Sequence, residues 1–137
     1  MAETYVLDSF ALLALLGKED GSGFVADLLH GTESDKIRTV MTWVNVGEVA
    51  YIVERRWGTR HLYQVLGLLE ATKVEIVPVG RNLALAAAHV KAEHPLAHAD
   101  AFAAALAIIE KATLVTGDPE FKPLEKRISI QWIGEQR

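Results

Sequence analysis

Short apolar segments alternate with longer helical segments along this chain, and two of the short segments end on an aspartate. The sequence YVLD ends on Asp8, and TLVTGD ends on Asp118. Strands separated by helices predict right-handed crossovers and a mainly parallel sheet with helices on both faces. An aspartate directly after such a strand lies at the carboxyl edge of the sheet, where open α/β sheets bind ligands.

The expected elements fill most of the 137 residues, without repeats. Strand patterns lie at 4–8, 37–42, 74–79, 113–118 and 128–134. Helical patterns lie at 9–17, 24–31, 42–58, 59–72, 81–94 and 98–112. Glycines are expected to end three of the helices, namely Gly17, Gly31 and Gly58. Pro78 suggests an edge or strand-end position for its strand. This length predicts a single α/β domain over residues 1–137.

The composition excludes several classes of site. The chain contains no cysteine, so a disulfide framework, a thiolate metal site and a cysteine nucleophile are excluded. The net charge of −4 argues against nucleic-acid binding by bulk electrostatics alone. The amino terminus lacks a secretion pattern, and the apolar runs are too short to span a membrane. We therefore expect a cytoplasmic protein without a membrane partner.

Two further acids, Glu48 and Asp100, lie inside apolar helical stretches, where an unpaired charge is costly to bury. The helix face around Glu48 is mainly apolar with one polar companion, and it carries Val44, Asn45, Tyr51 and Ile52. An ion pair between Glu48 and Arg55 is the alternative. For Asp100 the alternative is an ordinary acid in the first turn of a helix, where the helix dipole favours it.

The two strand-end acids also have local alternatives. Asp8 could cap the following helix, or Ser9 could cap it instead and leave Asp8 free to face the sheet edge. Asp118 lies in GDPEF, which is typical of an Asx turn. Thr116 is expected to point to the same side of the chain as Asp118. Glu120 is a candidate extra ligand, although a solvated turn acid is the commoner role.

A divalent metal would explain all four acids together. Two carboxylates about 4 Å apart repel by roughly 4 kcal/mol at an effective dielectric constant near 20. Oxygen ligands without cysteine favour Mg²⁺ or Mn²⁺ over zinc. A histidine zinc site is less favoured, because Pro95 disrupts the helical face that His94 and His98 would share. If bound metal neutralised these four acids, the charge of the rest of the chain would be close to balanced, so a polyanionic substrate is not excluded.

The order and context of the four acids resemble the PIN-domain nucleases, and more narrowly the VapC-like toxins of prokaryotic toxin–antitoxin pairs. The matching segments are YVLDSFALLALL with Asp8, NVGEVAYIV with Glu48, LAHADAFAAALA with Asp100 and LVTGDPEF with Asp118. The resemblance covers nearly the whole chain. Each motif is one acid in a short apolar frame, so the ordered set carries the specificity.

The resemblance implies a three-layer α/β/α PIN-like fold and an endoribonuclease that depends on Mg²⁺ or Mn²⁺. Asp8, Asp100 and Asp118 would hold the metal, and Glu48 would do so directly or through water. Thr116 matches a hydroxyl that the family often has two residues before the last aspartate. From their positions beside Asp8 and Glu48, Ser9 and Asn45 are further candidate supporting residues. The implied partners are an RNA substrate, a small antitoxin and a second copy in a homodimer, with operator DNA bound only through the antitoxin. One departure is Ala97, where many relatives carry a Ser or Thr that caps the Asp100 helix.

Two other functions stay open at this point. A non-catalytic interaction module could keep the same fold. A phosphorelay receiver also uses Mg²⁺ at a sheet edge, but it needs adjacent acids after the first strand and a lysine after a late one. Here Ser9 and Phe10 follow Asp8, and no lysine ends TLVTGD.

Overall fold

A five-stranded sheet forms the centre of the computed structural model, which describes residues 3–134. The strands are β1 (Glu3–Leu7), β2 (Ile37–Thr42), β3 (Glu75–Val77), β4 (Thr113–Thr116) and β5 (Ile130–Trp132). Their order is β3-β2-β1-β4-β5, and every pair of neighbours is parallel. The expectation of a mainly parallel sheet is therefore confirmed. The strand before Pro78 lies at an edge, as the proline predicts.

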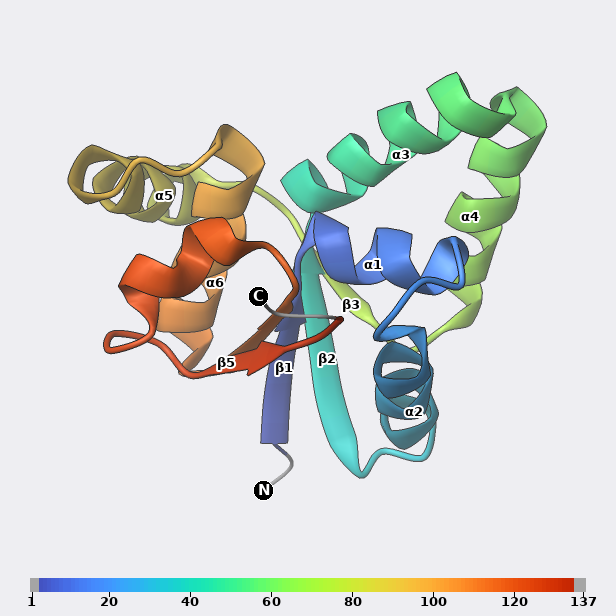
Figure 1. Ribbon diagram of the computed structural model, residues 1–137, viewed down its shortest axis with the longest axis horizontal. Coiled ribbons are helices and arrows are strands. Elements are labelled where there is room, and N and C mark those ends of the chain that lie inside the picture. Colours follow the sequence, from blue (N-terminus) through green and yellow to red (C-terminus); the bar gives the residue numbers. More distant parts are fainter. Residues whose placement is uncertain (1–2, 135–137) are drawn as a thin grey trace.

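Helices cover both faces of this sheet (Figure 1). They are α1 (Ser9–Leu16), α2 (Ser22–Glu33), α3 (Trp43–Trp57), α4 (Thr59–Ala71), α5 (Arg81–Glu93) and α6 (His98–Glu110), followed by the short 3₁₀ helix η1 (Pro119–Leu124). α1 to α4 lie on one side, and α5 and α6 lie on the other, which confirms the three-layer α/β/α fold. Within residues 3–134, no helix combines the length and apolar character needed to cross a membrane.

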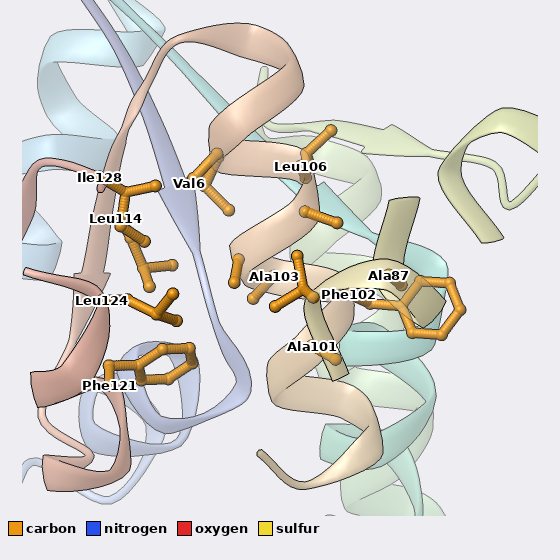
Figure 2. Packing of buried hydrophobic residues seen from close by; sticks show 14 of the residues in the cluster. Val6, Ala87, Ala101, Phe102, Ala103, Leu106, Leu114, Phe121, Leu124 and Ile128 are labelled. Atoms are coloured by element: carbon orange, nitrogen blue, oxygen red, sulfur yellow. The ribbon is translucent and has the colours of Figure 1, made fainter. Parts of the chain in front are cut away.

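The central strands bury side chains on both faces because consecutive residues point in opposite directions. Val6 and Leu114 belong to the core shared with α5, α6 and η1, which Figure 2 shows from close by. Their neighbours Leu7 and Val115 belong to the second core, with α1 to α4. The strands are therefore anchored from both sides, so their carboxyl ends are held in fixed positions.

Most of α6 is buried. Residues 99–107 are all buried, and six of them are alanines. Five of these belong to the core shared with α5 and η1, namely Ala101, Ala103, Ala104, Ala105 and Ala107. Figure 2 shows this helix between Val6 of β1 on one side and Ala87 of α5 on the other. A helix that is apolar on every face is expected to be buried in this way. Asp100 is the single charged residue in this buried stretch.

Most of the expected helix ends agree with the structure. Gly17 and Gly58 follow α1 and α3 as their C-caps, and the Thr42 side chain caps α3 by accepting a hydrogen bond from the Asn45 N–H. The expected end at Gly31 is wrong, because α2 continues to Glu33. A Cβ atom at Gly31 would lie 2.9 Å from Ile37 Cδ1, so glycine here permits close packing instead.

The segment after β4 extends beyond the expected turn. It continues from Asp118 into η1, which begins with Pro119. A proline suits the first position of a helix because its missing N–H would have no partner there. Phe121 and Leu124 of this short helix are buried in the same core as α6, so they fix the segment that contains Asp118.

Candidate metal centre

The predicted acids gather at the carboxyl edge of the sheet, beside its central strand. From β1 the chain adds β2 and β3 on one side and then returns to place β4 on the other. Ligands bind at such a switch point in open α/β sheets because the crossovers diverge there. Asp8 directly follows β1, and Asp118 lies two residues beyond β4.

Asp8 is fully buried and uses its two carboxylate oxygens differently. Oδ1 accepts a hydrogen bond of 2.8 Å from the Ala11 N–H and so caps α1. Oδ2 is buried and has no hydrogen-bond partner among residues 3–134. Burial raises the pKa of Asp8 to about 7, although the Thr116 hydroxyl and the Ala11 N–H favour the charged form. The capping role thus leaves one oxygen without a partner.

Ser9 does not replace Asp8 as the helix cap. Its hydroxyl is buried and donates a hydrogen bond to the Asn45 carbonyl at 3.3 Å. Of the two alternatives for this helix start, the structure therefore has Asp8 as the cap and Ser9 as a contact to α3.

Asp118 begins the turn that was expected for it. Its Oδ1 accepts a hydrogen bond of 2.9 Å from the Glu120 N–H, which is an Asx-type contact. Its own N–H donates to Thr116 Oγ1 at 3.0 Å. Thr116 is fully buried and also favours the charged form of Asp8. This hydroxyl therefore lies between the two strand-end acids.

Asp100 and Asp118 form a close acidic group with Glu120. One carboxylate oxygen from each of the three lies within 4.8 Å of the others. Burial, together with the negative charges of Asp118 and Asp8, raises the pKa of Asp100 to about 8. Glu120, expected only as an extra ligand, thus belongs to the tightest cluster. Asp8 lies outside this group of three but near enough to act on Asp100.

Glu48 is half-buried on α3 and does not form the alternative ion pair with Arg55. The Arg55 guanidinium instead lies over the Tyr51 ring, 5.2 Å from its centre. The negative charge of Glu48 raises the pKa of both Asp8 and Asp100. Glu48 therefore acts electrostatically on the same edge as the three aspartates.

This donor set fits a divalent cation that prefers oxygen ligands. Its members are Asp8, Glu48, Asp100, Asp118 and Glu120, and none of them forms an ion pair within residues 3–134. The unpartnered Oδ2 of Asp8 supplies an oxygen that a cation would satisfy. Mg²⁺, Mn²⁺ and Ca²⁺ take carboxylate oxygens. The histidines do not add a zinc site, because His94 ends α5 and His98 begins α6, packed edge-on against Phe102.

One feature of this edge was not found by sequence reasoning. A Cβ atom at Gly117 would overlap the Phe10 ring and lie 2.9 Å from the Ile133 carbonyl oxygen. The glycine therefore lets α1 and the segment after β4 approach closely. The Gly-Asp-Pro sequence predicts only a turn. The close approach of Gly117 to Phe10 joins residues far apart in the chain, so no local sequence pattern indicates it.

Comparisons with known proteins identify relatives of this fold. A family model described as PIN domain matches residues 5–126. A search of curated proteins found no match.

Several solved structures share the fold. One is a chain of VapBC2 from Rickettsia felis bound to a DNA fragment from their promoter, with 18% identity, coverage of 96% of this chain and 99% of that chain, and a TM-score of 0.73. A second is a chain of DNA-bound VapBC from Salmonella typhimurium (19% identity, coverage 96% and 98%, TM-score 0.71). A third is Mycobacterium tuberculosis VapC20, described as a sarcin-ricin loop cleaving toxin (18% identity, coverage 87% and 93%, TM-score 0.70).

Proposed function

Because the chain belongs to the PIN-domain family, we propose that it is a divalent-metal-dependent endoribonuclease and the toxin of a toxin–antitoxin pair. The whole chain, residues 1–137, would act as one nuclease domain in the cytoplasm. The observation that carries the proposal is the Asp8 carboxylate, which is fully buried among other acids with one oxygen unpartnered. A buried carboxylate without a partner is costly, and a bound cation would offset that cost.

In this proposal Mg²⁺ or Mn²⁺ is held by Asp8, Asp100 and Asp118, with Glu48 as a ligand directly or through water. Glu120 is an additional candidate, because its carboxylate lies in the cluster with Asp100 and Asp118. When bound, the ion supplies Lewis-acid polarisation of the scissile phosphate and lowers the pKa of a bound water.

The chain's own groups would orient the remaining reactants. Glu48 is half-buried at this edge without an ionic partner, so its carboxylate is available to orient the attacking water and accept its proton. The Thr116 hydroxyl accepts the Asp118 N–H and acts on Asp8, so it keeps these two acids in a fixed relation. The Ala11 N–H holds Asp8 Oδ1 and leaves Oδ2 available.

The proposed partners follow from the relatives. The Rickettsia felis and Salmonella typhimurium structures are VapBC complexes bound to DNA. We therefore assign this chain a small antitoxin as its partner, with operator DNA bound through that antitoxin. The VapC20 toxin is described as cleaving the sarcin-ricin loop, which supports RNA as the substrate class. A homodimer is part of the same proposal.

A cleavage assay tests the nuclease proposal. The purified protein is incubated with structured RNAs in Mg²⁺ or Mn²⁺, with a chelator, and as the Asp8→Asn variant. We expect cleavage by the native protein with metal, none in chelator, and a loss of at least about 100-fold for the variant, since even residues that only support metal ligands contribute 10–100-fold.

The matched control is Asp27→Asn, which removes an exposed carboxylate from α2. It is expected to cleave like the native protein. Equal cleavage by Asp8→Asn, or undiminished cleavage in chelator, would contradict the proposal. For the toxin role, expression without the antitoxin should arrest growth, and Asp8→Asn should relieve the arrest.

A further inference from the structure

A buried amide joins three helix starts at the acidic edge. Asn45 on α3 is fully buried. Its Nδ2 donates to Ser9 Oγ and to the Ala99 carbonyl oxygen, both at 3.2 Å. Its Oδ1 accepts a hydrogen bond of 2.6 Å from Thr42 Oγ1, which in turn accepts the Asn45 N–H at 3.0 Å. All polar groups of this side chain are therefore used.

The orientation of the amide follows from its partners. The Ala99 carbonyl oxygen can only accept a hydrogen bond, so Nδ2 and not Oδ1 must face it. In that orientation Oδ1 faces Thr42 Oγ1, which has a proton to give. A flipped amide would bring two oxygens together at Ala99. Asn45 therefore has one satisfied orientation, and that orientation ties α3 to both α1 and α6.

Both groups that accept a hydrogen bond from Asn45 Nδ2 belong to residues next to one of the acids. Ser9 follows Asp8, and Ala99 precedes Asp100. Asn45 itself lies one helical turn before Glu48 on α3. The amide thus contacts the three helix starts from which the buried and half-buried acids project.

The start of α6 needs such a contact more than the other two. α1 and α3 are capped by the side chains of Asp8 and Thr42, but α6 follows Ala97 and has no side-chain cap. Like charges also act on this turn, since Asp118 and Asp8 raise the pKa of Asp100. The hydrogen bond from Asn45 to Ala99 is therefore a tether that opposes the separation of α6 from α3.

We propose that Asn45 is a positioning residue that holds Asp8, Glu48 and Asp100 in the arrangement that binds the metal ion. The inference rests on the proposed function, because it concerns the same acidic site. Asn45 acts through Ser9 and Ala99 and does not itself contact the ion. Groups that orient metal ligands typically contribute 10–100-fold to metal affinity or activity.

The test measures Mn²⁺ binding by the full chain, using the electron paramagnetic resonance signal of free Mn²⁺. The main variant is Asn45→Ala. Ser9→Ala is a milder second variant, because it removes one of the two acceptors of Nδ2 and leaves the tie to Ala99. Hydrogen exchange of the amides at the start of α6 gives a readout that does not depend on metal.

The matched control is Thr39→Val on β2. The Thr39 hydroxyl is fully buried and lies 2.6 Å from the Thr32 hydroxyl, which also bonds to the Leu28 carbonyl oxygen. The control removes a buried hydrogen bond between β2 and α2, away from the acids. It is expected to lower the melting temperature and leave Mn²⁺ affinity unchanged.

We expect Asn45→Ala to weaken Mn²⁺ binding by about 10–100-fold, and Ser9→Ala to weaken it by a smaller factor. Amide exchange at residues 99–101 should become faster in Asn45→Ala, and kcat for RNA should fall while KM changes little. The proposal is overturned if folded Asn45→Ala binds Mn²⁺ as the native protein does. If Asn45→Ala does not fold, unchanged Mn²⁺ affinity in Ser9→Ala overturns it.

This outcome is separable from the proposed function. If the native protein neither binds Mn²⁺ nor cleaves RNA, the proposed function fails. If the native protein does both and the Asn45 and Ser9 variants match it, only the positioning role fails.

Discussion

The acidic side chains at the two edges of the parallel sheet differ in whether they form ion pairs. At the amino edge, Arg38 pairs with Glu75 and with Glu110, and Lys73 pairs with Asp35. At the carboxyl edge, five carboxylates gather without an ion pair among residues 3–134, namely Asp8, Glu48, Asp100, Asp118 and Glu120. The same fold thus pairs several acids with cations at one edge and leaves the acids at the other edge without such partners.

This difference distinguishes charged side chains that stabilise the fold from charged side chains that are suited to binding a ligand. The amino-edge groups are exposed or half-buried, and such pairs contribute roughly 0–1 kcal/mol each. The carboxyl-edge acids lower the stability of the metal-free protein, because burial and mutual repulsion raise the pKa of Asp8 and Asp100. We infer that the carboxyl edge is adapted to a cation and the amino edge is not.

The largest expected difference between the edges is in activity. Asp100→Asn should lower RNA cleavage by at least about 100-fold, because it removes a proposed ligand rather than a group that supports one. Glu110→Gln removes a carboxylate from the other end of the same helix and should leave cleavage within about threefold of the native value, since a partly exposed ion pair contributes little. Rates at saturating Mn²⁺ check both variants, and similar losses would break the comparison.

The pH dependence of metal-free stability should come next in size. A carboxyl group whose pKa rises from 3.8 to about 7 on folding binds its proton more tightly in the folded state. The free energy of unfolding should therefore fall as pH rises from about 4 to 7, by up to about 1.4 kcal/mol per pH unit for this group. Above pH 7 the contribution of Asp8 should be constant.

Denaturant unfolding in chelator, at several pH values, checks this expectation. Asp8→Asn should lose much of the decline and be more stable than the native protein near pH 8. The shared slopes of other groups cancel in the difference between the two proteins. If the free energies of unfolding of the native protein and the variant changed with pH in parallel, the pKa of Asp8 would not be raised in the folded protein.

A smaller effect is expected from closing the space at Gly117. Gly117→Ala places a methyl group into the Phe10 ring and against the Ile133 carbonyl oxygen. Such overpacking typically costs about 1–3 kcal/mol, and here it should also weaken Mn²⁺ binding because Asp118 is the next residue. Gly67→Ala is the control, since its Cβ meets nothing within 4 Å and it lies inside α4.

Thermal unfolding and Mn²⁺ titration of the two alanine variants distinguish an effect on the metal site from an effect on the stability of the fold. Gly67→Ala should raise the stability by roughly 0.5–1 kcal/mol through helix propensity and leave Mn²⁺ affinity unchanged. If Gly117→Ala binds Mn²⁺ normally, then the close approach of α1 to the segment after β4 is not needed for the site.

The smallest effect is expected at the amino edge. Arg38→Met removes the cation shared by Glu75 and Glu110 and should lower stability by about 1 kcal/mol, with a smaller difference at high salt. Mn²⁺ affinity should not change. Equilibrium unfolding at low and high salt measures this effect, and a loss of metal binding would show that the two edges are not independent.

The sequence predicts the strands and the edge at which the acids meet. Apolar segments that end on Asp8 and Asp118, separated by helices, leave few alternatives to a parallel sheet with both acids at one edge. Glu48 and Asp100 were identifiable because charges rarely occur in apolar helix faces. These signals are local, so they can be read from spacing alone.

Other features depend on contacts between distant segments and could not be read in this way. The tie from Asn45 to Ala99 requires α3 and α6 to meet at their starts. Glu120 joins the acidic cluster because its N–H bonds back to Asp118 Oδ1. The end of α2 could not be predicted for the same reason. Gly31 lies inside the helix and permits close packing against Ile37, so it does not end the helix.

The central claim is that the carboxyl-edge acids form a metal site. Crystals of the protein grown with Mn²⁺ test it most directly, through anomalous diffraction at a wavelength where manganese scatters. We predict a peak within ligand distance of Asp8 Oδ2 and of the Asp100 and Asp118 carboxylates, at about 2–2.4 Å for oxygen ligands, and no such peak in Asp8→Asn crystals. A native map at saturating Mn²⁺ without a peak among these acids would contradict the claim.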